Sequence, residues 1–489
     1  MSKKVLAFDF GASSGRAMLA VYNGKEITMR EIHRFSNDPV KLNGVFYWDI
    51  LRLMHEIKQG IVKAVNDGGF DAIGIDTWGV DFGLIDREGR LLENPVHYRD
   101  ERTVGIIEEA ARVVPKEEIY ARTGIQFARF NTLFQLFYLK QHRPELLEKT
   151  DKFLMMPDLM AYFLTGEKRA EYTVASTGQL LNPETREWDI ELIEKLGIPS
   201  RILPKLIPSG GQYGLLSDEI CGELGCEKVP VIAVATHDTG SAVVSVPNTS
   251  NDFVYISCGT WSLFGTELDH PVINKKSESY NFTNEGGYGG KIRFLKNIMG
   301  LWLIQESRRQ WIREGFDVSY GDLEREALAC EPFKCFVDVD DPAFETPGNL
   351  PKRIQEFCER TGQYVPKNRG EIMRCIYQSL AMKYRYTYEC LEDVSGKKYD
   401  AIHMIGGGTK DNLLCQMTAD YCKVKVVAGP IEATATGNVA VQLISLGELK
   451  DISAARQVIA DSLNPVFYHP HADVDCEAAY QEYLKVIGK

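Results

Sequence analysis

The sequence has no cysteine before Cys221, although eleven cysteines occur among its 489 residues. Their odd number and irregular spacing argue against a disulfide framework, so we expect a cytoplasmic protein with reduced thiols, including those of Cys358 and Cys375. Cys221 with Cys226 and Cys330 with Cys335 share a C-x4-C spacing. Neither pair has a neighbouring histidine or a second close pair, which favours small buried side chains over a zinc site.

The sequence also lacks a long apolar run and a basic run. After the basic start MSKK, Asp9 and Arg16 interrupt the apolar residues, so neither a secretory signal nor a transmembrane segment is predicted. The formal net charge of −12 argues against nucleic acid or an anionic membrane as the main partner. A small substrate that is neutral or accompanied by a cation fits this charge better.

The length and composition indicate a globular protein with two domains. A chain of 489 residues exceeds one hydrophobic core, and its 44% hydrophobic and 25% charged residues are typical of a folded protein. No low-complexity linker separates the halves. The polar, proline-bearing stretch VPNTSN at 246–251 is the favoured boundary, which gives domains 1–246 and 247–489.

The first half alternates strand and helix patterns. Asn23-Gly24 interrupts two alternating apolar runs and predicts a hairpin. Apolar residues at helical spacing predict a helix over 51–69, followed by strands over 70–92 with a turn at 86–89. The buried-strand pattern of 229–235 carries His237 and Asp238 at its carboxyl end.

The second half repeats parts of the first, which indicates a duplication. Placing FDFGASSGRAML against YISCGTWSLFGT aligns Gly11 with Gly259 and small hydroxyl residues with Thr260 and Ser262, each between apolar strands. A strand then leads through Gly406-Gly407-Gly408 into a helix, and a helix rich in small residues is predicted over 432–447. Between the second of these segments and the three glycines, a long amphipathic helix is predicted, with Ile372, Ile376 and Leu380 on one face. The predicted fold class is α/β.

The stretch AFDFGASSGRAML has the composition of a phosphate-binding hairpin. Backbone N–H groups of a glycine-rich turn approach phosphate oxygens closely, while Ser13, Ser14 and Arg16 add donors. Asp9 would repel phosphate unless a metal lay between them, which suggests Mg²⁺ bound by Asp9 or its waters. Neither a Walker G-x4-G-K-[ST] sequence nor G-x-G-x-x-G is present, so two hairpins, the second at Gly259 and Thr260, are expected to hold the nucleotide phosphates.

Several motifs together resemble the FGGY carbohydrate kinases over almost the whole chain. They are DFGASSGR, DTWGVDF, THDTGSA, SCGTWSL, LKNIMGLW and IGGGTKDNLL. DTWGVDF followed by YRDERT and LKNIMGLW is similar to the members that phosphorylate L-rhamnulose at its 1-hydroxyl. The general signatures that name the family are poorly kept, so sugar contacts of glycerol or xylulose kinases are not carried over.

The resemblance implies two ribonuclease-H-like domains of the actin-like ATPase fold, with ATP and the sugar in the cleft between them. It implies that the nucleotide contacts are Ala12, Ser13, Ser14, Gly15, Arg16, Thr260, Gln305 and Gly407. It implies that the sugar contacts are Gly79, His237, Asp238, Thr239 and Asn297, with Asp238 as the catalytic base. Closure of the domains is expected to exclude water as a competing acceptor, so hydrolysis without sugar should be slow.

Asp238, His237 and Trp78 each allow two interpretations. Asp238 suits a catalytic base, since phosphoryl transfer needs one proton accepted, but it also suits a helix N-cap. His237 is interpreted as a hydrogen-bond partner that orients sugar hydroxyls rather than as the base. Trp78 either stacks on the sugar or belongs to the core. Asp76 and Asp81 have odd spacing along a strand, so at most one is expected to face the site.

Three further segments also allow two interpretations. The three glycines at 406–408 exceed the needs of a plain turn, and an adenine or ribose lying against bare backbone explains the excess. Asn297 is either an ordinary surface residue or part of a buried helix starting at LKNIMGLW that carries it into the cleft. The acidic run 337–341 is interpreted as a solvated loop rather than a metal site, because adjacent carboxylates repel and the spacing matches no calcium loop.

Two other functions stay open at this point. The first is a kinase of the same family for another ketose or deoxysugar, such as fuculose or xylulose. The second is an actin-like or chaperone-like ATPase, although no polymerisation insert or peptide-binding domain is evident after Gly447. A monomer or a small homo-oligomer is expected.

Overall fold

The computed structural model describes residues 2–248, 252–462 and 465–489, and these fall into two compact units. Unit 1 comprises Met1–Asn251, Glu267–Leu295 and Ala433–Asn464, and unit 2 comprises Asp252–Thr266, Lys296–Glu432 and Pro465–Lys489. The boundary predicted at 246–251 falls in part on 249–251, which lie outside the described residues, and the division into 1–246 and 247–489 stays a prediction. Within the described part of the chain, no helix has the length and apolar character needed to span a bilayer.

Unit 1 is built on a six-stranded sheet with the order β13-β14-β6-β1-β2-β3. Neighbouring strands β1 and β2 are antiparallel, whereas β1, β6 and β14 run parallel. This arrangement confirms the predicted hairpins at both ends of β2. The strands are β1 (Lys3–Phe10), β2 (Ser14–Tyr22), β3 (Ile27–Ser36), β6 (Ala72–Thr77), β13 (Gly211–Leu215) and β14 (Pro230–Ala233).

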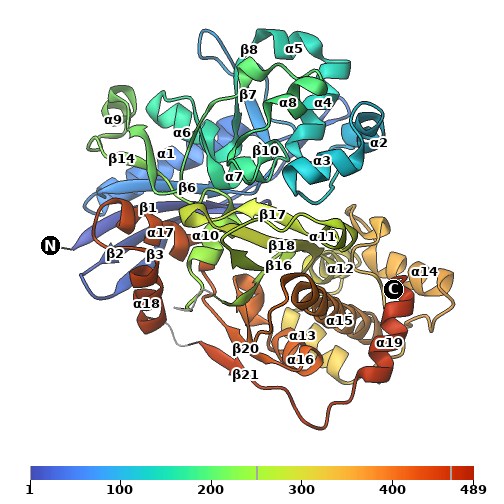
Figure 1. The fold of residues 1–489 in the computed structure, drawn as a ribbon. Helices are drawn as coiled ribbons and strands as arrows, with labels where there is room; N and C mark the ends of the chain where they lie inside the picture. Colours follow the sequence, from blue (N-terminus) through green and yellow to red (C-terminus); the bar gives the residue numbers. More distant parts are fainter. Residues whose placement is uncertain (1, 249–251, 463–464) are drawn as a thin grey trace. The chain divides into compact units, whose positions relative to one another are not determined.

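Both faces of the sheet are covered at its central strand β1, whose side chains alternate between two cores. Leu6, Phe8 and Phe10 pack with helix α1 (Ile50–Asn66) and helix α6 (Met156–Thr165). Val5 and Ala7 pack on the opposite face with helix α17 (Ala433–Ser445). Figure 1 shows α1 and α6 on one side of the strands and α17 on the other.

The other elements of unit 1 are short. Its remaining helices are α2 (Ile106–Ala111), α3 (Lys116–Thr123), α4 (Thr132–His142), α5 (Pro144–Lys149), α7 (Tyr172–Ser176), α8 (Ile190–Lys195), α9 (Asp218–Leu224), α10 (Asp238–Val244), α11 (Lys275–Ser279) and α18 (Ile452–Ser462). Two-stranded ladders join β4 (Val40–Leu42) to β5 (Val45–Tyr47), β7 (Phe82–Asp86) to β8 (Thr150–Met155), β9 (Arg169–Glu171) to β12 (Lys205–Ile207) and β10 (Leu181–Asn182) to β11 (Glu187–Trp188). Strand β17 (Thr283–Gly286) pairs antiparallel with β18 (Ile292–Met299) in a larger, seven-stranded sheet. Helix α1 confirms the helix predicted over 51–69.

Helix α1 shows how local chemistry sets the ends of an element. The Asp49 side chain accepts a hydrogen bond from the Arg52 backbone N–H at 3.1 Å and caps the first turn. The helix ends before Gly68 and Gly69, whose φ angles of +88° and +79° lie in the left-handed region that glycine adopts without strain.

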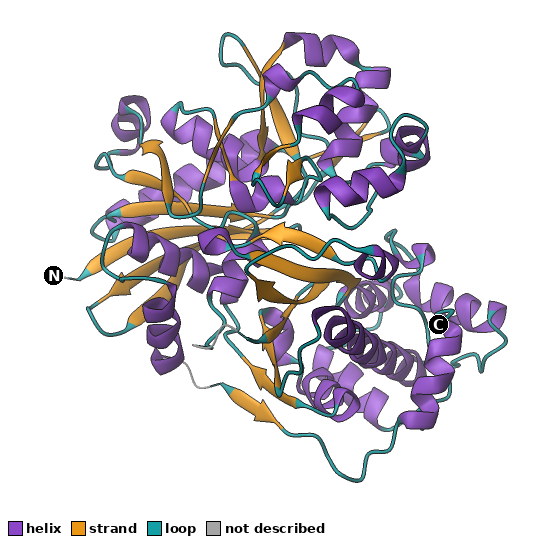
Figure 2. Cartoon of the chain, viewed as in Figure 1, coloured by secondary structure: helices purple, strands orange, loops and turns teal. Residues whose placement is uncertain are grey.

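Unit 2 repeats the central topology of unit 1. Strands β15 (Val254–Cys258) and β16 (Trp261–Leu268) form an antiparallel hairpin, and β15 runs parallel to β19 (Ala401–Ile405), as β1 does to β6. Strands β20 (Lys425–Ala428) and β21 (Val466–Tyr468) follow β19 in the sheet. Each unit thus places a hairpin beside a parallel strand, which supports the predicted duplication. Figure 2 shows the alternation of helices and strands typical of an α/β fold.

The helices of unit 2 include the predicted long amphipathic helix, which is α15. Helix α15 packs against α13 and α16. The helices are α12 (Trp302–Arg313), α13 (Tyr320–Leu328), α14 (Leu350–Arg360), α15 (Arg369–Ser395), α16 (Asn412–Cys422) and α19 (Glu477–Val486). Single 3₁₀ turns are η4 (Pro342–Phe344) and η5 (Gly407–Lys410) in unit 2, and η1 (Glu101–Thr103), η2 (Ser200–Ile202) and η3 (Tyr288–Gly290) in unit 1.

Close packing of α17 on α10 predicts a stability effect of Gly437→Ala. A Cβ atom at Gly437 would lie 1.8 Å from the backbone oxygen of Ser241 in α10, so the two helices would have to separate. We expect a loss of about 1–3 kcal/mol in the free energy of unfolding, measured by denaturant unfolding. The matched control is Gly222→Ala in α9, where no atom lies within 4 Å of the added Cβ, and it should be neutral or slightly stabilising. Equal stability of Gly437→Ala and the wild type would contradict this packing.

Candidate active site

Three carboxylates of unit 1 lie at one edge of its sheet. Asp9 in β1 and Asp76 in β6 are register partners near the carboxyl ends of parallel strands. Asp238 is the first residue of α10, which follows β14. The carboxyl ends of parallel strands meet at one edge, where open α/β sheets bind ligands. Asp76 is fully buried, whereas 32% of the Asp238 side chain is exposed.

The three carboxylates repel one another. Burial raises the pKa of Asp76 well above its usual range, and the charges of Asp9 and Asp238 raise it further, against a hydrogen bond from Asn438. Burial also raises the pKa of Asp238; His237 opposes this shift and Asp9 adds to it. Carboxyl groups with raised pKa values, such as those of Asp76 and Asp238, are typical of sites that accept protons or hold cations.

The predicted phosphate hairpin has the expected turn, and its arginine contacts Asp9. The Gly11 N–H donates to the Ser14 carbonyl at 2.9 Å and closes the turn between β1 and β2. Arg16 donates to one oxygen of Asp9 from Nε at 3.0 Å and from Nη2 at 2.7 Å. This ion pair balances part of the negative charge at the sheet edge. The turn itself contains Ala12 and Ser13, and β2 begins with Ser14 and Gly15.

The proton of the His237 ring is positioned by a buried arginine. Arg293, which is fully buried in β18, places Nη2 3.0 Å from His237 Nδ1 and 3.1 Å from a carboxylate oxygen of Glu285. A guanidinium group only donates hydrogen bonds, so Nδ1 accepts and the proton of the neutral ring resides on Nε2. Nε2 lies 3.5 Å from an Asp238 oxygen. In this tautomer Nε2 of His237 is a hydrogen-bond donor, and its role in orienting a sugar stays a prediction.

A second buried acid fixes the segment that leads into α10. Both the backbone N–H and the hydroxyl of Thr236 donate to Glu171, at 3.2 and 2.7 Å. The same Glu171 oxygen caps α7 by accepting from the N–H groups of Thr173 and Val174. The Thr77 N–H donates to the Thr236 carbonyl at 2.9 Å, so β6 also holds this segment. The position of Asp238 is therefore set from several sides.

The alternative interpretation of Asp238 as a helix N-cap is wrong by one residue. His237 is the N-cap of α10, and its side chain makes no capping hydrogen bond. The Asp238 carboxylate instead accepts hydrogen bonds from the backbone N–H and the hydroxyl of Thr239, its neighbour. Sequence reasoning missed Arg293, Glu285 and Glu171. The signal for Arg293 was available, because an arginine between Ile292 and Phe294 interrupts an apolar strand.

The raised pKa of Asp238 predicts an acid limb in the pH profile. As a general base Asp238 would be inactive once protonated, so kcat/KM would fall as the pH drops through its pKa. The limb should lie above the ordinary aspartate value of about 3.9, because burial and Asp9 raise the pKa. Thr239 donates to the ionised form, so Thr239→Val should move the limb to higher pH. A limb unmoved by Thr239→Val would argue against Asp238 as its origin.

The DTWGVDF segment is held by hydrogen bonds within itself and from neighbouring elements. Asp81 is buried and accepts hydrogen bonds from the indoles of Trp48 and Trp78 at 2.6 and 3.0 Å, and its pKa is raised by burial to about 6. Trp78 is buried in the core, as its structural alternative predicted. A Cβ atom at Gly79 would lie 2.8 Å from the Thr177 hydroxyl.

Val80 is strained, and the strain is supported by hydrogen bonds. Its φ angle of +66° is rare for a β-branched residue. Its N–H donates to the Thr177 hydroxyl at 3.1 Å, and its carbonyl accepts from the Thr132 hydroxyl at 2.7 Å. Such over-determined strain is concentrated at ligand sites. Thr77 forms a β-bridge with His237, and Gly79 lies only two residues further along the chain.

Predicted nucleotide residues lie together in unit 2. The Thr260 hydroxyl donates to the Gln305 side chain at 3.2 Å, which joins the second hairpin to α12. Gly406 has a φ of +88°, and a Cβ at Gly408 would lie 2.2 Å from the Cys258 sulfur. These two glycines are thus explained by the fold. Gly407 differs, because an added Cβ would meet no atom within 4 Å.

Two sequence interpretations in unit 2 need correction. LKNIM belongs to strand β18, and α12 begins only at Trp302, so Asn297 lies half-buried on a strand rather than in a helix. The acidic run 337–341 is not simply a solvated loop. Asp338 and Asp340 lie 2.9 and 2.8 Å from the ammonium group of Lys383, a buried residue. Burial alone would lower the pKa of Lys383, but these two carboxylates raise it.

Comparison with known families identifies relatives along the whole chain. The profile of the FGGY family of carbohydrate kinases, N-terminal domain, matches residues 4–245, and that of the C-terminal domain matches residues 254–446. A rhamnulokinase of Bacteroides thetaiotaomicron is 44% identical over 100% of both chains. A rhamnulokinase of Halalkalibacterium halodurans is 45% identical over 94% of this chain and 97% of its own.

Solved structures show the same fold at low sequence identity. A ligand-bound xylulose kinase from Lactobacillus acidophilus superimposes with a TM-score of 0.81 at 17% identity, covering 99% of this chain and 96% of its own. Plasmodium falciparum glycerol kinase with ADP gives a TM-score of 0.78 at 15% identity, covering 99% and 98%. The predicted α/β fold with two ribonuclease-H-like domains of the actin-like ATPase type is confirmed.

Proposed function

Because the chain belongs to the FGGY family of carbohydrate kinases, we propose that it transfers the γ-phosphoryl group of ATP to the 1-hydroxyl of L-rhamnulose. Membership of a kinase family implies ATP as the donor and a divalent metal ion. The choice of sugar is supported by the rhamnulokinases that are 44–45% identical over nearly the full length of both chains. The observation that carries the chemistry is the Asp238 carboxylate with its raised pKa beside a histidine that donates.

Asp238 is the proposed general base. The attacking hydroxyl must lose one proton as the phosphorus–oxygen bond forms, and a positioned carboxylate accepts it. The fixed ring of His237 presents Nε2–H beside the same carboxylate, where it can donate to a sugar hydroxyl or to Asp238. Thr239 holds one oxygen of the base. Asn297 and the backbone at Gly79 complete the proposed sugar contacts.

The proposed ATP site uses both hairpins. Ala12, Ser13, Ser14, Gly15 and Arg16 would contact the phosphates, and Thr260, Gln305 and Gly407 would complete the nucleotide site. Open space beside Gly407 supports an adenosine contact there, because its two neighbouring glycines are already required by the fold. Arg16 would share its charge between Asp9 and the phosphates.

The carboxylates at the sheet edge suit a divalent cation, which we propose to be Mg²⁺ held by Asp9. One oxygen of Asp9 binds Arg16, which leaves the other oxygen for a metal or its water. One carboxylate oxygen of the buried Asp76 has no hydrogen-bond partner among the described residues, so negative charge at this edge is incompletely balanced. When bound, Mg²⁺ neutralises phosphate charge and orients the triphosphate.

The remaining proposals concern organisation. Residues 1–246 are proposed to carry the first hairpin and the sugar site, apart from the contact of Asn297, and residues 247–489 the second hairpin and the adenosine site. A cytoplasmic monomer or small homo-oligomer without a nucleic-acid or membrane partner is proposed, in keeping with the net charge of −12.

The proposal is tested by ADP release with a panel of sugars. We expect kcat/KM for L-rhamnulose to exceed kcat/KM for L-fuculose or xylulose by at least about tenfold, the effect of a single well-placed hydrogen bond. The rate of ADP release without sugar should be lower than the rate with L-rhamnulose by at least about the same factor. Faster turnover of L-fuculose or xylulose would support a kinase of the same family with another substrate. ADP release that does not depend on any sugar would favour an actin-like or chaperone-like ATPase and overturn the proposal.

A further inference from the structure

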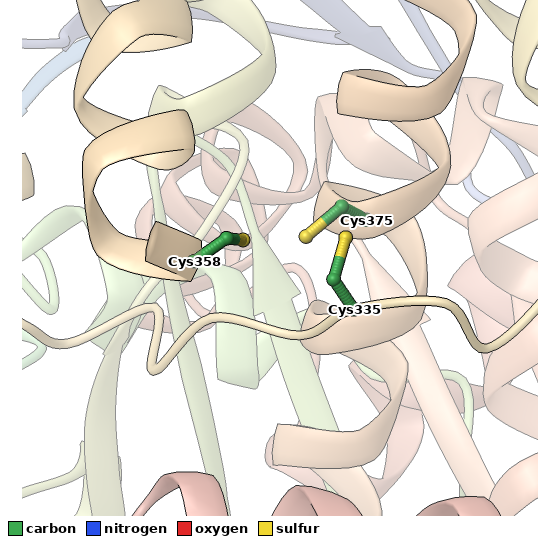
Figure 3. A group of neighbouring side chains, drawn as sticks. All are labelled: Cys335, Cys358 and Cys375. Carbon is green, nitrogen blue, oxygen red and sulfur yellow. The ribbon is translucent and has the colours of Figure 1, made fainter. Parts of the chain in front are cut away.

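Three cysteines from distant parts of the sequence meet in the interior of unit 2. Cys335 lies in the loop before η4, Cys358 in α14 and Cys375 in α15, and all three are buried. Their sulfur atoms lie within 4.8 Å of one another. Figure 3 shows the three sulfur atoms converging from these separate segments. No other group of three metal-ligating side chains is this close among the residues that the structure describes.

The loop that carries Cys335 is fastened to both helices. The Phe336 N–H donates to the Gln363 side chain at 2.8 Å, and the Gln363 amide donates back to the Phe336 carbonyl at 2.9 Å. Gln363 in turn donates from its backbone to the Cys358 carbonyl. On the other side, the Val337 N–H donates to the Ser379 hydroxyl, which donates to the Cys375 carbonyl. The backbone at or next to each of the three cysteines is therefore fixed by hydrogen bonds.

We propose that Cys335, Cys358 and Cys375 bind one thiophilic divalent metal ion of the zinc and cadmium class. Sulfur ligands lie about 2.3 Å from zinc, so three of them around one ion are about 4 Å apart, close to the observed arrangement. Three thiolates and a divalent ion leave one net negative charge, which costs less to bury than the two left by a monovalent ion such as Cu⁺. A fourth position stays available for a small ligand such as water.

Binding requires release of the thiol protons, so affinity should increase with pH. A disulfide is the competing chemistry, but it joins only two sulfurs at about 2.05 Å and leaves the third unused.

The experiment uses the full-length protein, reduced, stripped with a chelator and kept anaerobic, with Cd²⁺ as the probe. We expect saturation at one Cd²⁺ per chain, seen as an ultraviolet thiolate-to-cadmium absorption band. Cys335→Ser and Cys375→Ser should each lose this one-equivalent binding. The matched control is Cys330→Ser, which should keep it, because the Cys330 sulfur donates to the Glu326 carbonyl and lies outside the group.

A protection experiment covers the case in which a serine variant fails to fold. In wild-type protein, Cd²⁺ should slow alkylation of Cys335, Cys358 and Cys375, located by peptide mapping, while leaving Cys221 and Cys226 unaffected. Absence of saturable binding, binding that persists in folded Cys335→Ser, or a disulfide joining two of the three cysteines in protein isolated without oxidant would each overturn the proposal. Because these readouts do not use ATP or sugar, they are independent of the proposed kinase function.

Discussion

Replacement of Asp238 by asparagine should lower kcat by about 10²–10⁴-fold, with little change in the affinity for the sugar, because a general base contributes a factor of that size. Asparagine has nearly the same shape and can still accept hydrogen bonds from Thr239. The fold and the surrounding contacts should therefore persist. Steady-state kinetics with coupled ADP detection measure kcat, and calorimetry of sugar binding measures affinity.

The matched control for this prediction is His237→Gln. Glutamine keeps a donor near Asp238 but cannot act as a base at neutral pH, so its kcat should fall much less than that of Asp238→Asn. This expectation depends on Arg293, whose hydrogen bond at 3.0 Å makes His237 Nδ1 an acceptor. A large loss in His237→Gln combined with a small loss in Asp238→Asn would transfer the role of base to His237.

The second large effect is expected at Arg293. Replacement by methionine would leave the Glu285 carboxylate, 6% exposed in its side chain, without the guanidinium 3.1 Å away. Removing one partner of a buried ion pair costs about 3–5 kcal/mol in the free energy of unfolding. The hydrogen bond from Arg293 Nε to the Gly286 carbonyl at 2.8 Å is lost as well. Denaturant unfolding of the purified variant measures the change.

A double variant separates stability from catalysis at this position. Glu285→Gln combined with Arg293→Met contains no buried charge at the pair, so it should recover a large part of the lost stability. It still lacks the donor that fixes the His237 ring, so kcat/KM should remain below that of the wild type. Arg293→Met as stable as the wild type would show that this ion pair is not needed by the fold.

The features that sequence predicts well here are local. The β1–β2 hairpin follows from Gly11 between two apolar runs, and the repeat at Gly259 follows from the same pattern. The place of Asp238 follows from a buried strand that ends just before it. In each case neighbouring residues determine the backbone conformation. The composition of about ten residues and the spacing of their apolar side chains are therefore enough to predict it.

The features that sequence reasoning missed depend on distant partners. Leu295, Ile298, Met299 and Trp302 have helical spacing, yet strand pairing with β17 holds residues up to Leu295 extended, and β18 continues to Met299. Tertiary pairing overrides a local period of this kind. Arg293 reaches His237 across 56 positions of the chain, and no local pattern encodes that contact.

The central claim is that this chain phosphorylates L-rhamnulose at its 1-hydroxyl, and identification of the product tests it most directly. Incubation with ATP, Mg²⁺ and L-rhamnulose, followed by ³¹P and ¹³C NMR of the purified product, gives the position of the new phosphate ester. The account predicts a single product with the ester at carbon 1 and an equal amount of ADP. An ester at another carbon, or ADP without any sugar phosphate, would contradict it.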